Sequence, residues 1–337
     1  MPLLRLIRWQ NLLIIFLTQL LAWACVILPA ADADTRLLLT TENFLILSLS
    51  TILIAAAGYI INDYFDIKID MINRPHKMVL EKRIPIKSAI ILHTVFNIFG
   101  LFLAVVLVRQ GGRYSWLLLQ LSCTLLLWFY STHFKRQFVS GNVVVAMLTA
   151  LTIITLIIYE PSLHAYVLRR PFIHTADGVM PNPVWVLGIY TFFAFMLTWM
   201  REIVKDMEDF KGDAEQGCVT MPIKWGLQRS VWFTQGLGVV ALIPLINAGI
   251  KLLLERWWFL GSYTLLALVV PMVLWLLTLH KTATQQHYAT ASRRLKFIMV
   301  AGIVSLIIYY IEAHAQDRFG ITVATEETVD GSRRTGI

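Results

Sequence analysis

The chain has 337 residues, of which 57% are apolar and only 15% are Asp, Glu, Lys or Arg. A soluble globular protein carries about a quarter charged residues and a little under half apolar residues. Together with a mean hydropathy of +0.66, this composition excludes a disordered chain, a disulfide-rich scaffold and a water-soluble enzyme. It indicates a polytopic membrane protein. In such a protein a net charge of +8 is typical of basic membrane loops, so we expect no nucleic-acid partner.

Nine apolar stretches are each long enough to cross a bilayer, which takes roughly 20 residues. They lie at about 11–30, 43–61, 86–108, 114–130, 141–159, 183–200, 230–250, 258–279 and 295–312. The first stretch also resembles a signal peptide, but bulky Trp23 does not suit a cleavage site, and we interpret it as a span. The sequence therefore predicts an all-α protein with nine transmembrane helices. They form one domain, residues 1–312, which a polar and disordered C-terminal tail follows at 313–337.

Lysine and arginine residues are unevenly divided between the two ends of these spans. Nineteen lie on the side of the N-terminus and seven on the opposite side, apart from three in the tail. Because cytoplasmic loops are enriched in Lys and Arg, this division predicts a cytoplasmic N-terminus. We expect an integral protein of the cell's inner (cytoplasmic) membrane, with its C-terminus outside.

Two acidic clusters follow apolar helices on the predicted cytoplasmic side. Both have the pattern D-x-x-D-x-x-x-D, with aspartates at positions 63, 66 and 70 and again at 206, 209 and 213. On a helix such residues share one face, and neighbouring carboxylates repel unless a cation neutralises them. Oxygen ligands suit Mg²⁺, which proteins often share with substrate phosphates. A solvated helix end with mixed charges is the alternative for either cluster alone, and the identical spacing of the two argues against it.

Basic residues surround the two clusters. A metal ion together with cationic side chains is a common way to hold a pyrophosphate. The sequence has no Gly-rich nucleotide loop of the Walker type, which favours a lipid diphosphate over ATP. The predicted diphosphate-binding residues are Arg74, Lys77, Tyr130, Lys135, Arg136, Lys205 and Lys211.

These motifs resemble those of the UbiA superfamily of intramembrane prenyltransferases. The family's N-D-x-x-D-x-x-x-D motif is matched by Asn62, Asp63, Asp66 and Asp70, and its K-D-x-x-D-x-x-G-D motif by Lys205 to Asp213. The segment from Tyr130 to Lys135 and Arg136 is similar to Y-x-x-x-K-R, with one residue more. The similarity extends from residue 5 to about residue 312 and leaves out the tail.

The resemblance implies a helix bundle around a central cavity and Mg²⁺-dependent transfer of a prenyl group from a polyprenyl diphosphate to an acceptor. It also implies site residues. Metal ligands are expected at Asn62, Asp63, Asp66, Asp70, Asp206, Asp209 and Asp213, of which Asp66, Asp70, Asp209 and Asp213 are expected to be catalytic. Acceptor contacts are expected from Arg8 and Asn11, which resemble the family's N-terminal Arg/Asn pair. Aromatic candidates for stabilising an allylic cation are Tyr59, Phe129, Phe195 and Trp199.

The acceptor is less well defined. The run from Arg201 to Asp209 is most similar to the digeranylgeranylglyceryl-phosphate synthase branch, which alkylates a glycerol-phosphate ether lipid. We therefore expect a geranylgeranyl donor and a membrane lipid acceptor, geranylgeranylglyceryl phosphate. Branches with aromatic acceptors (hydroxybenzoate, homogentisate or naphthoate) and a terpene cyclase remain alternatives. A transporter would need acidic residues within the spans, whereas both clusters lie at helix ends.

Overall fold

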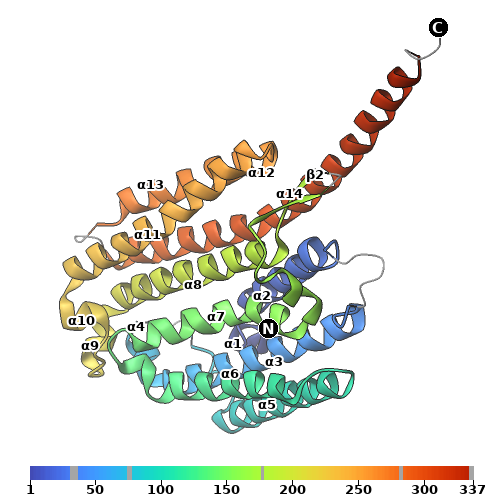
Figure 1. Cartoon of the computed structure of the whole chain (residues 1–337). Helices are drawn as coiled ribbons and strands as arrows, with labels where there is room; N and C mark the ends of the chain where they lie inside the picture. Colours follow the sequence, from blue (N-terminus) through green and yellow to red (C-terminus); the bar gives the residue numbers. More distant parts are fainter. Residues whose placement is uncertain (31–36, 74–77, 176–177, 281–283, 334–337) are drawn as a thin grey trace.

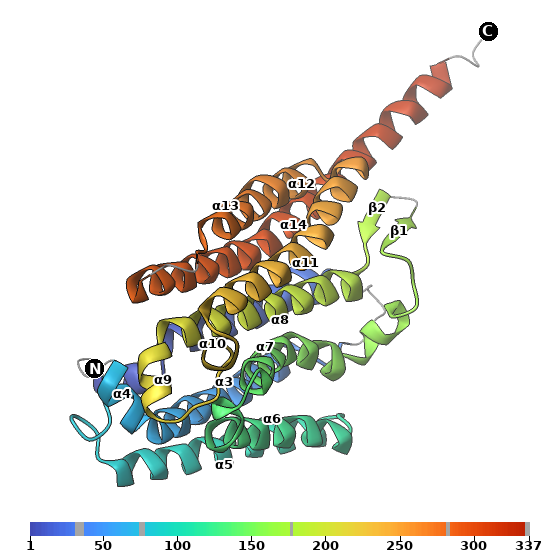
Figure 2. The ribbon, with the colours of Figure 1, turned by 90° about the vertical axis from the view of Figure 1, so that its left-hand side faces the viewer.

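The computed structural model describes residues 1–30, 37–73, 78–175, 178–280 and 284–333. Long helices lie side by side in a bundle, and the end of the last helix projects beyond it (Figures 1 and 2). In chain order the elements are α1 (Pro2–Leu6), α2 (Trp9–Ala22), a π-helical segment (Trp23–Ile27), α3 (Thr41–Phe65), α4 (Ile67–Asn73), α5 (Ile86–Arg109), α6 (Tyr114–Thr132), a 3-10 turn (Phe134–Arg136), α7 (Ser140–Tyr159), a second 3-10 turn (Pro161–Tyr166), β1 (Phe172–Thr175), β2 (Gly178–Pro181), α8 (Pro183–Glu208), α9 (Phe210–Glu215), α10 (Met221–Trp225), α11 (Leu227–Leu254), α12 (Trp258–Tyr263), a π-helical segment (Thr264–Val269), α13 (Val270–Thr278) and α14 (Gln285–Arg333).

The predicted spans correspond to the long helical segments of the bundle. Within the described ranges, eight segments are long and apolar enough to cross a membrane. The predicted fourth span, α6, is not among them because polar residues such as Gln120 and Ser122 interrupt its 19 residues. Helix α6 nevertheless packs in the bundle against α3, α5 and α7. Large apolar side chains such as Phe99, Leu118 and Phe297 are exposed on the outer surface, as expected of helices that face lipid.

Two parts of the fold differ from the prediction. A short antiparallel hairpin of β1 and β2 interrupts the connection between α7 and α8; its four-residue strands are too short for a clear alternating pattern. In the polar tail, which was expected to be disordered, α14 continues to Arg333. A helix that is already formed in the bundle can extend without a second nucleation step.

Two buried carboxylates far from the aspartate motifs serve the fold. Glu160 accepts hydrogen bonds from the backbone N–H of Leu39 at 2.8 Å and from that of Ser162, at the start of the second 3-10 turn, at 3.2 Å. Glu312 accepts from the N–H groups of Phe259 and Leu260, at 3.1 and 2.8 Å, where α12 begins. Backbone N–H groups at a helix start have no partner within the helix, and these carboxylates satisfy them. Both are therefore structural caps, and neither is the free intramembrane acid that a transporter would use.

The two aspartate motifs have the same local structure. Helix α3 ends at Asp66 and helix α8 ends at Asp209, with nearly equal backbone angles (φ −90°, ψ −3° and φ −93°, ψ 7°). A short helix follows each break, and these two helices, α4 and α9, contact each other. Figure 2 shows both at the same end of the bundle. The fold thus brings two motifs that are far apart in sequence to one place.

Candidate active site

A cavity of about 290 Å³ lies beneath α4 and α9, between α2, α3, α6, α7, α8 and α14. Both aspartate motifs face it. The predicted site residues that line it are Arg8, Asn11, Asn62, Asp66, Asp70, Tyr130, Lys135, Lys205, Asp206, Asp209 and Asp213. The structure therefore brings together most of the residues that the sequence analysis proposed.

Some predicted site residues lie elsewhere. Asp63 lines an adjoining cavity of about 570 Å³, where its carboxylate accepts a hydrogen bond from Arg8 Nη2 at 2.6 Å. Burial would lower the pKa of Arg8, but this ion pair and other neighbours, among them Asp66, together outweigh burial and raise the pKa above its ordinary value. Two predicted diphosphate-binding residues are exposed and line neither cavity, Arg136 and Lys211. Two more lie outside the described residues, Arg74 and Lys77.

The first motif forms a tight network around Asp66. This buried carboxylate accepts a hydrogen bond from Asn62 Nδ2 at 2.7 Å and forms an ion pair with Lys135. Burial alone would lower the pKa of Lys135, but the charge and the hydrogen bond of Asp66, together with other neighbours, outweigh burial and raise the pKa. Burial and the neighbouring charge of Asp66 raise the pKa of Asp70 to about 6. The carboxylates thus repel each other, and a bound cation would relieve that repulsion.

The second motif faces the first across the cavity. Asp206 accepts a hydrogen bond from Asn142 Nδ2 of α7 at 2.9 Å. Asp209 ends α8, and Asp213 on α9 is only 7% exposed. All three carboxylates border the same space as Asp66 and Asp70.

The carboxylates that line the cavity suit a hard divalent cation that also binds a substrate. Among the described residues, no three His, Cys, Asp or Glu side chains are close enough to hold a metal ion by themselves. Mg²⁺ commonly binds only one or two protein carboxylates and completes its shell with water and phosphate oxygens. Carboxylates on two sides of an open cavity fit that kind of site and do not fit a closed metal centre.

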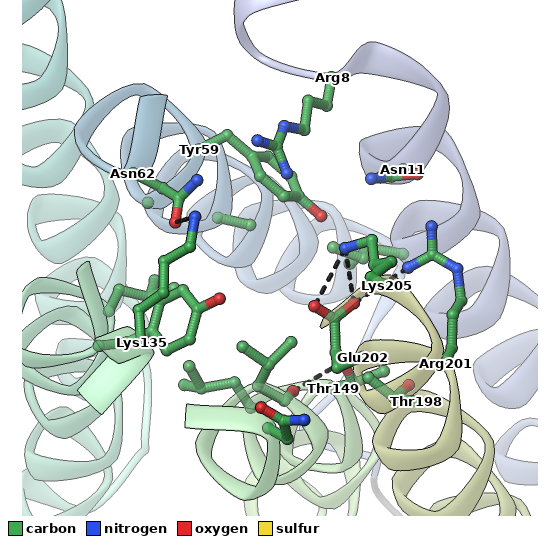
Figure 3. A pocket seen from close by; sticks show the side chains of 18 of the residues that line it. Arg8, Asn11, Tyr59, Asn62, Lys135, Thr149, Thr198, Arg201, Glu202 and Lys205 are labelled. Atoms are coloured by element: carbon green, nitrogen blue, oxygen red, sulfur yellow. Dashed lines mark hydrogen bonds and ion pairs between the residues drawn. The ribbon is translucent and has the colours of Figure 1, made fainter. Parts of the chain in front are cut away.

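Sequence reasoning missed Glu202 on α8 and its ion pairs. Glu202 accepts hydrogen bonds from Lys205 Nζ at 2.7 Å and from Arg201 Nη1 at 3.1 Å. Figure 3 shows this group on one side of the cavity, with Lys135 and Asn62 on the other. Glu202 lies one helical turn before Asp206, and that i, i+4 spacing is the signal that could have identified it.

Only one of the four aromatic candidates borders the site within the described part of the chain. The Tyr59 ring lines the cavity, and the guanidinium of Arg8 lies 5.1 Å from its centroid. Phe195 and Trp199 form an aromatic cluster with Phe233 of α11. Phe129 is exposed at the outer surface. Of these four candidates, Tyr59 is therefore the one that can contribute an aromatic ring to the site.

Residues 9–308 match the UbiA prenyltransferase family. The chain belongs to this family. It is therefore a prenyltransferase of the membrane, and the transporter alternative is set aside.

Similar proteins and structures agree with this assignment. The digeranylgeranylglyceryl phosphate synthase of Methanothermobacter thermautotrophicus is 30% identical over 276 residues, which cover 79% of this chain and 84% of the relative. The enzyme of the same name from Methanosphaera stadtmanae is 28% identical over 60% of this chain and 66% of the relative. The enzyme of that name from Sulfurisphaera tokodaii is 34% identical over 56% of this chain and 60% of the relative. The alignments with the last two thus span about two thirds or less of the relatives' own length.

Solved structures share the fold. A digeranylgeranylglyceryl phosphate synthase superposes with a TM-score of 0.59 at 23% identity, over 92% of this chain and 98% of that one. A UbiA homologue from Archaeoglobus fulgidus, bound to GPP and Mg²⁺, superposes with a TM-score of 0.55 at 14% identity. The superposition covers 91% of this chain and 99% of the homologue. The predicted all-α membrane bundle is confirmed.

Gly141 offers a test of how precisely the site is built. A Cβ atom at this position would lie 2.7 Å from the Phe134 carbonyl oxygen and 3.0 Å from Lys135 Cα. Gly141→Ala must therefore displace the backbone that carries Lys135. Because a misplacement of about 1 Å can reduce catalysis about 100-fold, we expect a loss of that order in kcat/KM for prenyl transfer. Gly188→Ala on α8, where a Cβ meets no atom within 4 Å, is the matched control, and equal activity of the two variants would contradict the expectation.

Proposed function

We propose that the protein is an Mg²⁺-dependent prenyltransferase that moves a geranylgeranyl group from its diphosphate to geranylgeranylglyceryl phosphate within the membrane. The observation that carries this proposal is the pair of matched aspartate motifs, which face one cavity inside a helix bundle. The names of the relatives support the substrates, and the neighbour bound to GPP and Mg²⁺ supports the donor class and the metal.

The proposed reaction is an alkyl transfer at the first carbon of the donor. The allylic C1–O bond breaks, and its electron pair leaves with the diphosphate. The acceptor hydroxyl oxygen bonds to C1, and its proton passes to the released diphosphate. When bound, Mg²⁺ supplies positive charge that neutralises the leaving diphosphate. Asp66, Asp70, Asp206, Asp209 and Asp213 would hold the metal and so fix the diphosphate in place.

Other residues of the cavity support the same chemistry. Lys135 Nζ, held by Asp66, can donate to the leaving oxygens as negative charge develops on them. The walls farther from the aspartates include the apolar side chains of Ile54, Leu127 and Leu151. They would exclude water from the allylic cation, and the face of Tyr59 can stabilise it.

The proposed orientation places the site and the N-terminus on the cytoplasmic side of the inner membrane. The support for it is the excess of Lys and Arg on the side of the bundle that carries both aspartate motifs. Labelling of cysteines introduced at either end of the spans, from one side of the membrane at a time, checks this orientation.

The acceptor is tested by incubating purified protein with labelled geranylgeranyl diphosphate, Mg²⁺ and one acceptor at a time. We expect a prenylated product with geranylgeranylglyceryl phosphate, and none with hydroxybenzoate, homogentisate or naphthoate. Chelation with EDTA should stop the reaction, and excess Mg²⁺ should restore it. Diphosphate release without transfer to any acceptor would support a terpene cyclase instead, and full activity in EDTA would contradict the metal requirement.

A further inference from the structure

A polar cavity separate from the active site lies at the junction of α13 and α14. Its volume is about 290 Å³, and its described lining residues are Thr278, Thr284, Gln286, His287, Thr290, Ala291 and Arg294. None of these residues lines the site cavity. Figures 1 and 2 show the start of α14 at the end of the bundle that carries α9 and α10. This cavity, which we call the α13–α14 cavity, therefore lies at the same end of the bundle as the aspartate motifs.

The α13–α14 cavity has an excess of positive charge. Arg294 lines it, Arg293 is the preceding residue of α14, and both are exposed. Arg294 Nη1 donates to Thr278 Oγ1 at 3.3 Å, and Arg293 Nη2 donates to Thr290 Oγ1 at 3.1 Å. Both partners are neutral hydroxyls, and among the described residues neither arginine pairs with a carboxylate. The sequence has no Asp or Glu between residues 256 and 311. Two guanidinium groups therefore lie here without a counter-charge.

The α13–α14 cavity also offers neutral hydrogen-bond donors. The amide of Gln286 and the hydroxyl of Thr284 line it together with Arg294. Thr284 Oγ1 accepts from the backbone N–H of His287 at 3.4 Å, and its own O–H can still donate. A guanidinium presents several N–H groups in a planar fork that matches the oxygens of a phosphate. Charge-assisted hydrogen bonds of this kind are stronger than neutral ones, so a phosphate group is the ligand that these donors fit.

Exposed apolar side chains continue the same helix faces away from the α13–α14 cavity. Leu274 is four residues before Thr278 on α13 and is 56% exposed, and Phe297 is three residues after Arg294 on α14 and is 70% exposed. Residues at these spacings share one face of a helix. On a membrane helix, such exposed apolar side chains contact lipid chains. The surface therefore suits an amphiphile, whereas an arginine that only sets membrane orientation needs neither a cavity nor an adjoining apolar face.

We propose that the α13–α14 cavity binds the phosphodiester head group of an anionic membrane lipid, whose chains lie along Leu274 and Phe297. A zwitterionic lipid carries its own positive charge and would not balance the two arginines, so an anionic lipid is preferred. The bound lipid would bridge α13 and α14, which the contact between Arg294 and Thr278 already joins. This lipid is neither the donor nor the acceptor, and the inference is independent of the proposed function.

The test is native mass spectrometry of the purified protein in detergent, titrated with phosphatidylglycerol or with phosphatidylcholine. The wild type should bind phosphatidylglycerol more tightly than phosphatidylcholine. Arg294→Gln should weaken binding of the first phosphatidylglycerol about fivefold, which is the usual contribution of one basic side chain to the binding of anionic lipid. The double variant Arg293→Gln/Arg294→Gln should weaken it about 25-fold. Inorganic phosphate at the same concentration should not displace the lipid, because it has no chains to contact Leu274 and Phe297.

Arg109→Gln is the matched control for charge. Arg109 is an exposed arginine at the end of α5 and lines none of the cavities described above, so this variant should bind phosphatidylglycerol as the wild type does. All these substitutions are at exposed positions, and size-exclusion chromatography checks that the variants fold. Equal binding of the two lipids by the wild type would overturn the inference, as would unchanged binding by the double variant or an equal loss in Arg109→Gln. Displacement of the lipid by inorganic phosphate would show a site for a free anion instead.

Discussion

Replacement of Asp66 by Asn is expected to reduce kcat for prenyl transfer about 1,000-fold, the upper range for loss of one preorganised electrostatic group. Asp66 ends α3, is 5% exposed and is held by Asn62 and Lys135. Asn preserves the shape of the side chain but removes the charge that would hold the metal. It also leaves Lys135 without its counter-charge. The substitution therefore removes both a proposed metal ligand and the ion pair that holds Lys135.

The measurement is single-turnover transfer in detergent, with folding checked by size-exclusion chromatography and thermal unfolding. Asp209→Asn should give a similar loss, because Asp209 has the equivalent position and backbone conformation at the end of α8. Glu215→Gln, an exposed acid on α9, is the matched control and should retain activity. If both aspartate variants unfold, the motifs are structural; if both fold and remain active, the proposed metal site is wrong.

The spans and the aspartate motifs could be predicted because both depend on local sequence. A membrane span needs only about 20 apolar residues in a row, and the repeated D-x-x-D-x-x-x-D spacing is visible without knowledge of contacts. The structure adds that each helix breaks at the middle aspartate, at Asp66 and at Asp209, and continues as a short helix. A straight helical stripe of carboxylates was therefore too simple an expectation.

Which basic residues line the cavity could not be predicted from the sequence, because this depends on the direction in which each loop turns. Lys135 and Arg136 are neighbours in one 3-10 turn, yet only Lys135 lines the cavity within the described residues. Lys296 looked like a charge that sets membrane orientation. Its contact with Asn11 joins residues 285 positions apart, and no local pattern encodes such a contact. The same holds for Asp63, which faces Arg8 in the adjoining cavity.

The second large effect is expected from Lys135→Met, which should reduce kcat/KM for the donor about 100- to 1,000-fold. Lys135 lines the cavity and forms an ion pair with Asp66. It can contact the diphosphate as the allylic bond breaks, so kcat should fall more than the donor KM rises. Met preserves the length of the side chain, and Asp66 keeps its hydrogen bond from Asn62.

Steady-state kinetics with both substrates varied measure this effect. The acceptor KM should stay near the wild-type value, because Lys135 is expected to contact the diphosphate of the donor. Lys224→Met, a cation exposed at the same end of the bundle that lies over the Phe138 ring, is the control and should be fully active. Lys135→Arg should recover part of the rate if charge is what matters. A Lys135→Met enzyme whose acceptor KM rises while its donor kinetics are unchanged would contradict the assignment of Lys135 to the diphosphate of the donor.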